Sequence, residues 1–158
     1  AATQETTEYF DDAATKQDII DRTNALRREN GVSVLTVNGE LMQAAQVRAD
    51  EMAASGVYSH TRPDGRKYTT VTDCKYIGEN IHLIGEWQIR DSSLPSFAVE
   101  AWKNSAAHLK NMLNTRYHAI GVGVSQGTVM GEPYWYCVQL FLLDGYNVTW
   151  VDAPAAKG

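Results

Sequence analysis

Two strand-like segments near the C-terminal end constrain the fold of this chain most strongly. Apolar and polar residues alternate in YHAIGVGVSQG, residues 117–127, and again in PYWYCVQLFLL, residues 133–143. A period of two residues is that of a β-strand, and SQGTVMGEP, residues 125–133, is long enough to join the two strands as a hairpin. A shorter extended segment is expected at residues 75–83. These segments predict a sheet whose longest strands come late in the chain.

Helical patterns fill most of the chain before the hairpin. The first spans residues 17–30 and ends at Asn30-Gly31, a pair that commonly terminates helices. The second begins after Asn38-Gly39 and stops at Ser55-Gly56. The residues expected to face the core are Ile19, Ile20, Thr23, Leu26 and Arg27 in the first helix, and Leu41, Ala45, Ala49 and Met52 in the second.

Two shorter helices are expected in the middle of the chain. One lies within residues 91–105, where Ser93 can cap the N-terminus and Pro95 suits the first turn. The other lies within residues 104–114, and either Asn104 or Ser105 can cap it. Its inward-facing residues are expected to be Leu109, Met112 and Leu113. Because helices come first and strands come last, we expect α+β layers rather than a parallel βαβ sheet.

The bulk properties fit one ordinary globular domain of 158 residues. We expect this domain to cover residues 17–150, with a flexible leader at residues 1–16 and a tail at residues 151–158. The formal charge of −5 argues against nucleic acid and anionic membranes as partners. No apolar run approaches the ~20 residues that a membrane-spanning helix needs. If the protein is exported, its signal peptide has already been removed from this chain.

The two cysteines, Cys74 and Cys137, lie beside β-type residues. Facing strands could bring them together, and a disulfide closing so long a loop would stabilise the fold by about 4 kcal/mol. We therefore predict a Cys74–Cys137 disulfide and an extracytoplasmic location. The alternative is a pair of buried free thiols, which are common in cytosolic proteins.

The usual catalytic motifs are missing from the sequence: it has no phosphate-binding glycine loop, no G-x-S-x-G and no H-E-x-x-H. Of the four histidines, His82 and His118 are most simply surface or edge residues of strands. His60 follows the end of a helix, and His108 lies in the first turn of one; each has an ordinary structural explanation. Glu79 interrupts a β-type run, where a carboxylate is costly to bury unless it is paired.

Several segments together resemble a known family. They are YSHTRPDGR at residues 58–66, IGENI at 77–81, AVEAWKNSAAHLKNMLNTRYHAIGVGV at 98–124 and YWYCVQLF at 134–141. In this order they resemble the secreted CAP superfamily of cysteine-rich secretory, antigen 5 and pathogenesis-related proteins, in its shorter bacterial SCP-like form. The similarity covers roughly residues 17–143. It implies an α+β fold, a three-layer α-β-α sandwich around a central, mostly antiparallel sheet.

The resemblance also implies a cavity site made of two histidines and two glutamates. The histidines carry over to His60 and His108, and the glutamate of Gly-Glu-Asn carries over to Glu79. Ser105 stands where eukaryotic members have the second glutamate, and Glu100, about 140° around the helix from it, is a poor substitute. Some members bind Zn²⁺ or another divalent cation there. Two imidazoles and one carboxylate would suit zinc and leave a position open for water. A hydrogen-bonded polar network that only braces the fold is the alternative.

For function, the resemblance implies a secreted protein, extracellular or on the cell surface, with no established enzymatic activity. We expect it to bind a small ligand, a lipid or a surface component at or near the His-Glu-His cavity, and to be a monomer. One alternative is a zinc-dependent hydrolase or peptidase. Another is a structural interaction module of the cell envelope.

Overall fold

A four-stranded sheet forms the centre of the molecule in the computed structural model, which describes residues 12–90 and 92–151. The strand order is β1-β3-β4-β2, with β1 parallel to β3 and the other neighbours antiparallel. The strands are β1 Thr36–Val37, β2 Ile77–Gly85, β3 Tyr117–Val129 and β4 Glu132–Leu143. The sheet is therefore mostly antiparallel, as expected, and β2 is one of its edges.

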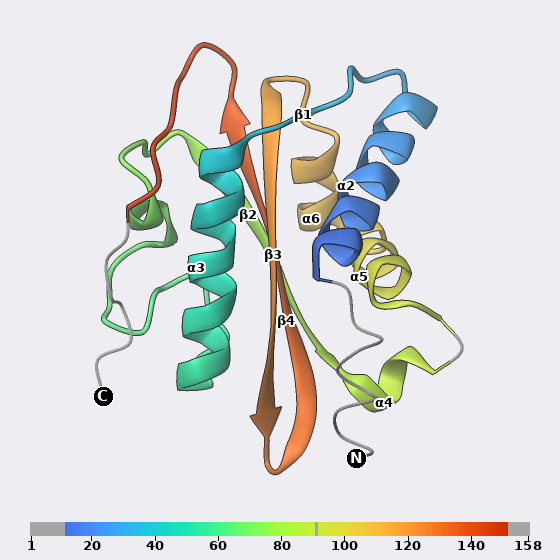
Figure 1. Cartoon of the computed structure of the whole chain (residues 1–158). Coiled ribbons are helices and arrows are strands. Elements are labelled where there is room, and N and C mark those ends of the chain that lie inside the picture. The colour runs from blue at the N-terminus through green and yellow to red at the C-terminus, as the bar shows by residue number, and fades with distance from the viewer. Residues whose placement is uncertain (1–11, 91, 152–158) are drawn as a thin grey trace.

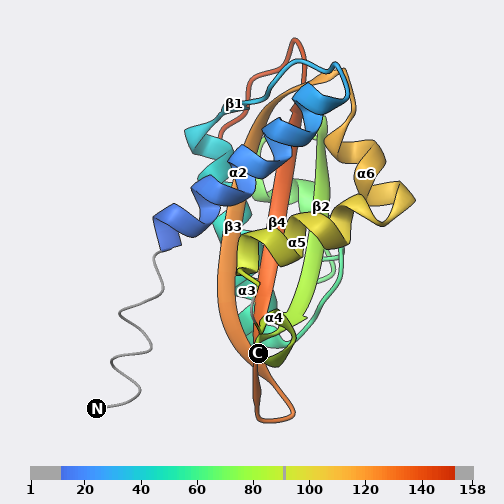
Figure 2. The same cartoon turned by 90° about the vertical axis from the view of Figure 1, so that its right-hand side faces the viewer.

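Helices cover both faces of this sheet (Figures 1 and 2). Helix α3 lies on one face, while α2, α5 and α6 lie on the other. The helical elements are α2 Asp12–Glu29, α3 Gly39–Ser55, the 3-10 helix η1 Tyr68–Val71, α4 Glu86–Ile89, α5 Leu94–Lys103 and α6 Ala106–Met112. This arrangement is the α+β, three-layer α-β-α sandwich that the sequence and the resemblance predicted.

Each face of the sheet has its own apolar core, and the predicted inward residues lie in these cores. On the α3 face, Leu41, Ala45, Ala49 and Met52 are fully buried. On the other face, Ile19, Ile20 and Leu26 of α2 pack with Trp102 and Met112. Leu109 and Leu113 pack against this second core from partly buried positions.

Two glycines in β3 let α3 approach the sheet closely. A Cβ atom on Gly121 would collide with the backbone of Leu41, and one on Gly123 would collide with the backbone carbonyl of Ala45. The intervening Val122 is fully buried in the core of the opposite face. The alternation Gly-Val-Gly-Val therefore serves helix packing on one face and core filling on the other.

Three boundaries differ from the expectations. The strand expected at residues 75–83 is β2 Ile77–Gly85, shifted by two residues. Helix α2 begins at Asp12, five residues before the expected start, and residues 1–11 lie outside the described part of the chain. The strands of the hairpin also continue through residues 125–133, so that only Met130 and Gly131 form the turn. Both have positive φ, 51° and 83°, as a tight type I′ turn requires. At the hairpin end of β3, residues 125–129 alternate between half-buried and exposed positions, and none of them is fully buried. The sequence therefore does not alternate between apolar and polar residues there.

The outer edge of β2 is closed by four side chains from different segments of the chain. The carbonyls of Ile77, Glu79 and Ile81 point away from β4, and each accepts a hydrogen bond. The donors are Tyr68 Oη to Ile77 at 3.0 Å, Asn111 Nδ2 to Glu79 at 3.3 Å, and Tyr58 Oη and Trp102 Nε1 to Ile81 at 3.2 and 3.1 Å. A further strand could not pair here without displacing these donors. The edge is instead the place where the η1 side and the α6 side of the molecule meet.

The predicted Cys74–Cys137 disulfide is wrong. Both cysteines are free and buried, and they belong to different cores. Cys137 lies in β4 and faces α2 and α5, whereas Cys74 packs in the core on the α3 face. Because the sheet separates the two thiols, a bond between them would need a rearranged fold. Strand periodicity places Cys137, but Cys74 lies in a loop, where no period indicates the face.

We expect thiol titration to find two free thiols per chain in unreduced, denatured protein, and Cys137 to be unreactive in native protein. Cys137 is fully buried, and burial raises its pKa to about 12, so that its reactive thiolate is scarce. Titration with a chromogenic disulfide reagent measures both states. Absence of free thiols after denaturation without reductant would contradict this arrangement.

Candidate functional site

His60 and Glu79 meet at the outer edge of β2. His60 follows α3 in the loop that leads to the Pro63-Asp64-Gly65 turn, and Glu79 is in the middle of β2. The Nδ1 atom of His60 lies 2.7 Å from Oε1 of Glu79. A carboxylate can only accept here, so the neutral imidazole donates from Nδ1 and carries its lone pair on Nε2. The Glu79 side chain is fully buried, while that of His60 is 55% exposed.

Arg48 holds the other side of the Glu79 carboxylate. Its Nε donates to Oε2 at 2.7 Å, and its Nη2 donates to Oε1 at 3.2 Å. Nη2 also donates to the backbone carbonyl of Ser59 at 2.6 Å, directly before His60. Burial by itself would lower the pKa of Arg48, but hydrogen bonds and charge from Glu79 and then Glu51 outweigh it and raise that pKa. Arg48 thus fixes both the carboxylate and the chain that carries the imidazole.

A second carboxylate extends this buried charge network. Glu51 accepts from Arg48 Nη1 at 2.9 Å and from Arg62 Nη2 at 2.9 Å. Arg62 is 1% exposed and also donates to Thr70 Oγ1 at 2.9 Å. Although Arg66 and Lys67 follow it closely in the sequence, the Arg62 guanidinium is therefore buried. The network joins α3 to the turn after His60 and to η1.

Arg48, Glu51 and Arg62 were not among the candidates drawn from the sequence. One signal was available, because Arg48 lies on the apolar stripe of its helix, seven residues after Leu41 and four before Met52. A charged residue in such a stripe indicates a buried ion pair.

His108 approaches the same strand edge from α6. Its Nδ1 lies 2.7 Å from Ser105 Oγ, and its backbone carbonyl accepts from Asn80 Nδ2 at 3.1 Å. Ser105 occupies the N-cap position of α6, but its hydroxyl bonds the imidazole rather than the helix backbone. No hydrogen bond found among the described residues uses Nε2 of either His60 or His108.

A buried chain of amides supports the α6 side. Asn111 Nδ2 donates to Asn80 Oδ1 at 2.9 Å, and Asn80 Nδ2 donates to Gln139 Oε1 at 3.1 Å. Gln139 Nε2 then donates to Thr23 Oγ1 at 2.7 Å. These bonds link α6, β2, β4 and α2, so the position of His108 is set by the core.

The predicted site residues are thus brought together only in part. His60 contacts Glu79, and Ser105 contacts His108, but no hydrogen bond joins the two pairs. Both Glu79 oxygens already accept hydrogen bonds from Arg48 or His60. Glu79 is therefore placed to orient the His60 imidazole, as carboxylates that bond a metal-binding histidine do, and not to bind a metal ion itself. The described ranges contain no group of three or more His, Cys, Asp and Glu side chains placed to hold a metal ion.

The histidines are close enough to influence one another's titration. Burial, and then the positive charge of His60, lower the pKa of His108 below its ordinary 6.5. Burial, and then His108, lower the pKa of His82. His118 lies elsewhere, with Nδ1 3.7 Å from Oδ1 of Asp144. The lowered pKa values of His108 and His82 therefore indicate that His60 lies near His108 and that His108 lies near His82.

We expect NMR titration to give His108 a pKa below 6.5, and His60→Gln to raise it without restoring the ordinary value. The substitution removes the repulsion by His60, but the burial remains. Since the unfolded chain takes up this proton first as the pH falls below 6.5, the stability that depends on His108 decreases on acidification. His118→Gln is the control and should leave the His108 titration unchanged. A His108 pKa at or above 6.5 would contradict this description.

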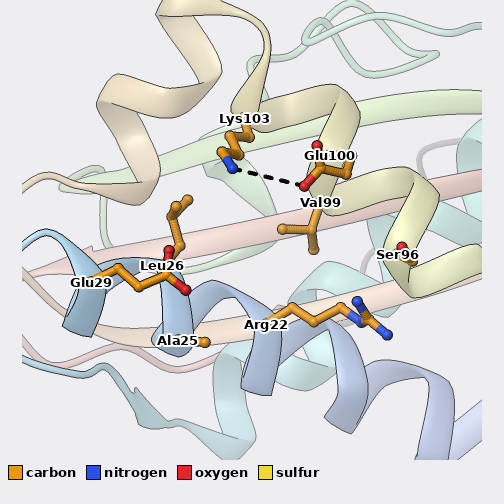
Figure 3. A pocket seen from close by; sticks show the side chains of 8 residues that line it. All are labelled: Arg22, Ala25, Leu26, Glu29, Ser96, Val99, Glu100 and Lys103. Atoms are coloured by element: carbon orange, nitrogen blue, oxygen red, sulfur yellow. Dashed lines mark ion pairs between the residues drawn. The ribbon is translucent and has the colours of Figure 1, made fainter.

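Two hollows lie away from this site. The first, about 180 Å³, lies between α2 and α5 (Figure 3). Leu26 and Val99 line it beside charged side chains, among them Lys103, which lies 4.0 Å from Glu100. The second, about 440 Å³, lies between residues 73–76 and residues 146–147. Neither includes His60, Glu79 or His108.

Comparison with known proteins identifies the family. The model of the CAP, or cysteine-rich secretory protein, family matches residues 20–141. The chain therefore belongs to this family. No helix in the described ranges is both long and apolar enough to cross a membrane.

Bacterial proteins are among its relatives. The chain is 28% identical over 124 residues to YkwD of Bacillus subtilis, covering 77% of this chain and 47% of that protein. An extracellular protein with an SCP domain from Bacillus anthracis is 25% identical with a TM-score of 0.65, over 84% of this chain and 41% of that one. An outer surface protein of Borrelia burgdorferi shares the fold at 19% identity, with a TM-score of 0.58, over 82% of this chain and 94% of that protein. The chain thus spans less than half of the first two relatives.

Proposed function

We propose that this protein is an extracellular bacterial binding protein whose ligand contacts the imidazoles of His60 and His108 at the outer edge of β2. One observation carries this proposal: each imidazole has its Nδ1 engaged by a neighbouring side chain, Glu79 or Ser105, at 2.7 Å. Such fixation orients a ring so that Nε2 is the atom it offers. The His60 side chain is 55% exposed, so a ligand can reach the ring from solvent. The extracellular Bacillus anthracis relative supports the location.

The ligand class follows from these two nitrogens. A divalent cation such as Zn²⁺ would accept both Nε2 atoms, with Glu79 and Ser105 behind them, and would take its other donors from water or from the bound molecule. A small molecule with polar groups could contact the same atoms by hydrogen bonds. We do not extend the proposal to hydrolysis, because catalytic zinc commonly has three protein ligands and Glu79 already pairs with Arg48.

Calorimetric titration of the full chain with Zn²⁺ tests the proposal. We expect one ion per chain, with affinity reduced at least tenfold by His60→Gln and by His108→Gln, since each removes one of two nitrogen donors. His118→Gln is the matched control, because His118 lies outside the site and should not contribute. Affinity that is equal in all four proteins would show that any bound zinc lies elsewhere and would refute the role of the two imidazoles.

A further inference from the structure

The second hollow differs in chemistry from the histidine site. Tyr76 and Tyr146 stack on one another at its wall, with ring centroids 4.2 Å apart and planes inclined by 21°. The two tyrosines are 39% and 41% exposed, so both rings reach solvent. The Lys75 ammonium lies 5.5 Å from the centre of the Tyr76 ring. An aromatic surface of this kind, left in solvent beside a hollow, is typical of ligand sites.

The loops that carry these side chains are held by hydrogen bonds. Asp73 and Thr149 exchange two: the Asp73 amide donates to the Thr149 carbonyl at 3.0 Å, and the Thr149 amide donates to Asp73 Oδ1 at 2.8 Å. The Leu143 amide donates to the Tyr76 carbonyl at 3.1 Å. The hollow is therefore preformed, and a ligand would not have to order it.

The polar lining narrows the ligand class. Asp73 and Lys75 bring one charge of each sign, and Asn147 adds an exposed amide. A purely apolar ligand would desolvate these groups without pairing them. An anionic polymer would meet a chain of net charge −5. A neutral saccharide suits both features, because a pyranose has C–H groups on its faces, which stack on aromatic rings, and hydroxyls around its rim, which bond carboxylate, ammonium and amide groups.

We propose that the hollow between residues 73–76 and 146–147 binds a neutral saccharide. The outer face of the Tyr146 ring is the stacking surface, Tyr76 stacks behind it, and Asp73, Lys75 and Asn147 are the hydroxyl partners. Pyranoses with equatorial substituents, as in β-1,4-linked chains, have the flattest C–H faces and fit this surface best. The proposal uses no residue of the histidine site and does not depend on it.

Amide NMR titration of the full chain with chitotetraose and cellotetraose tests this proposal. We expect saturable shifts at residues 73–76 and 144–147 with at least one of the two sugars. Tyr146→Ala should weaken binding about tenfold, the equivalent of 1.4 kcal/mol, because it removes one ring of the stack. Trp87→Ala is the control: Trp87 is 58% exposed on α4 and should not contribute.

The outcomes are separable. The proposal is overturned if neither sugar gives saturable shifts. It is also overturned if Tyr146→Ala leaves the sugar binding unchanged, or if Trp87→Ala weakens that binding as much as Tyr146→Ala does. If Tyr146→Ala does not fold, judged by its own amide spectrum, Asn147→Ala decides. No hydrogen bond to the exposed Asn147 side chain is found in the described structure, so this change should preserve the fold. Weaker sugar binding then supports the site, and unchanged binding overturns it.

Discussion

Replacing Arg48 by methionine is expected to lower the free energy of unfolding by about 3–5 kcal/mol. The substitution leaves the fully buried carboxylate of Glu79 without its guanidinium and removes one of the two arginines that Glu51 contacts. Methionine fills much of the same volume, so the loss would reflect uncompensated charge rather than a cavity. Urea denaturation of the purified protein measures the effect.

The matched control is Arg22→Met. Arg22 also pairs with an acidic residue, Asp18, but both side chains are 43% exposed. Exposed pairs contribute about 0–1 kcal/mol, so this variant should stay close to the parent. If Arg48→Met does not fold, Arg48→Lys retains the charge but loses the fork that spans both carboxylates, and should show a smaller loss. Equal, small effects of Arg48→Met and Arg22→Met would mean that the buried network does not support the fold.

Replacing Gly123 by alanine is expected to destabilise the protein by about 1–3 kcal/mol or more. The added methyl group would collide with the backbone carbonyl of Ala45, and backbone cannot swing aside as a flexible side chain can. Helix α3 would have to move away from β3, loosening the core that carries Arg48. Thermal or urea unfolding monitored by circular dichroism measures the loss.

Gly39→Ala is the control for this substitution. A Cβ atom at Gly39 has nothing within 4 Å, and this glycine begins the same helix without positive φ. Alanine there should leave the stability unchanged or raise it slightly, because it restricts the unfolded chain. If Gly123→Ala is as harmless as Gly39→Ala, the contact between α3 and the sheet is not tight.

Periodicity predicted the regular elements well. The buried set Ile19, Ile20, Thr23, Leu26 and Arg27 was correct in full, although Arg27 is there for a polar reason. Its guanidinium donates to the carbonyls of Ser33, Met112, Asn114 and Tyr117, at 2.7 to 3.3 Å. The helical period showed which side it faces, but not that it ties α2 to the segment between α6 and β3.

The candidate site was predicted less completely. Resemblance singled out His60, Glu79 and His108, and His60 does contact Glu79. It did not show that Arg48 donates to both oxygens of Glu79, because partners in a charge network are set by tertiary packing. The predicted disulfide was wrong for a related reason. Residue spacing indicates neither which face of the sheet a loop cysteine lies on nor that the sheet separates two thiols.

In the proposed site, Glu79 and Ser105 orient His60 and His108 so that both present Nε2 to one ligand. Long-range ¹H–¹⁵N NMR of the imidazoles, recorded above pH 7 with stepwise addition of Zn²⁺, tests this most directly. We expect neutral His60 to be protonated on Nδ1. We expect Nε2 of His60 and Nε2 of His108 to shift together and to reach saturation at one equivalent, while His118 stays unchanged. Protonation of His60 on Nε2, or zinc-dependent shifts confined to other histidines, would contradict the proposed arrangement.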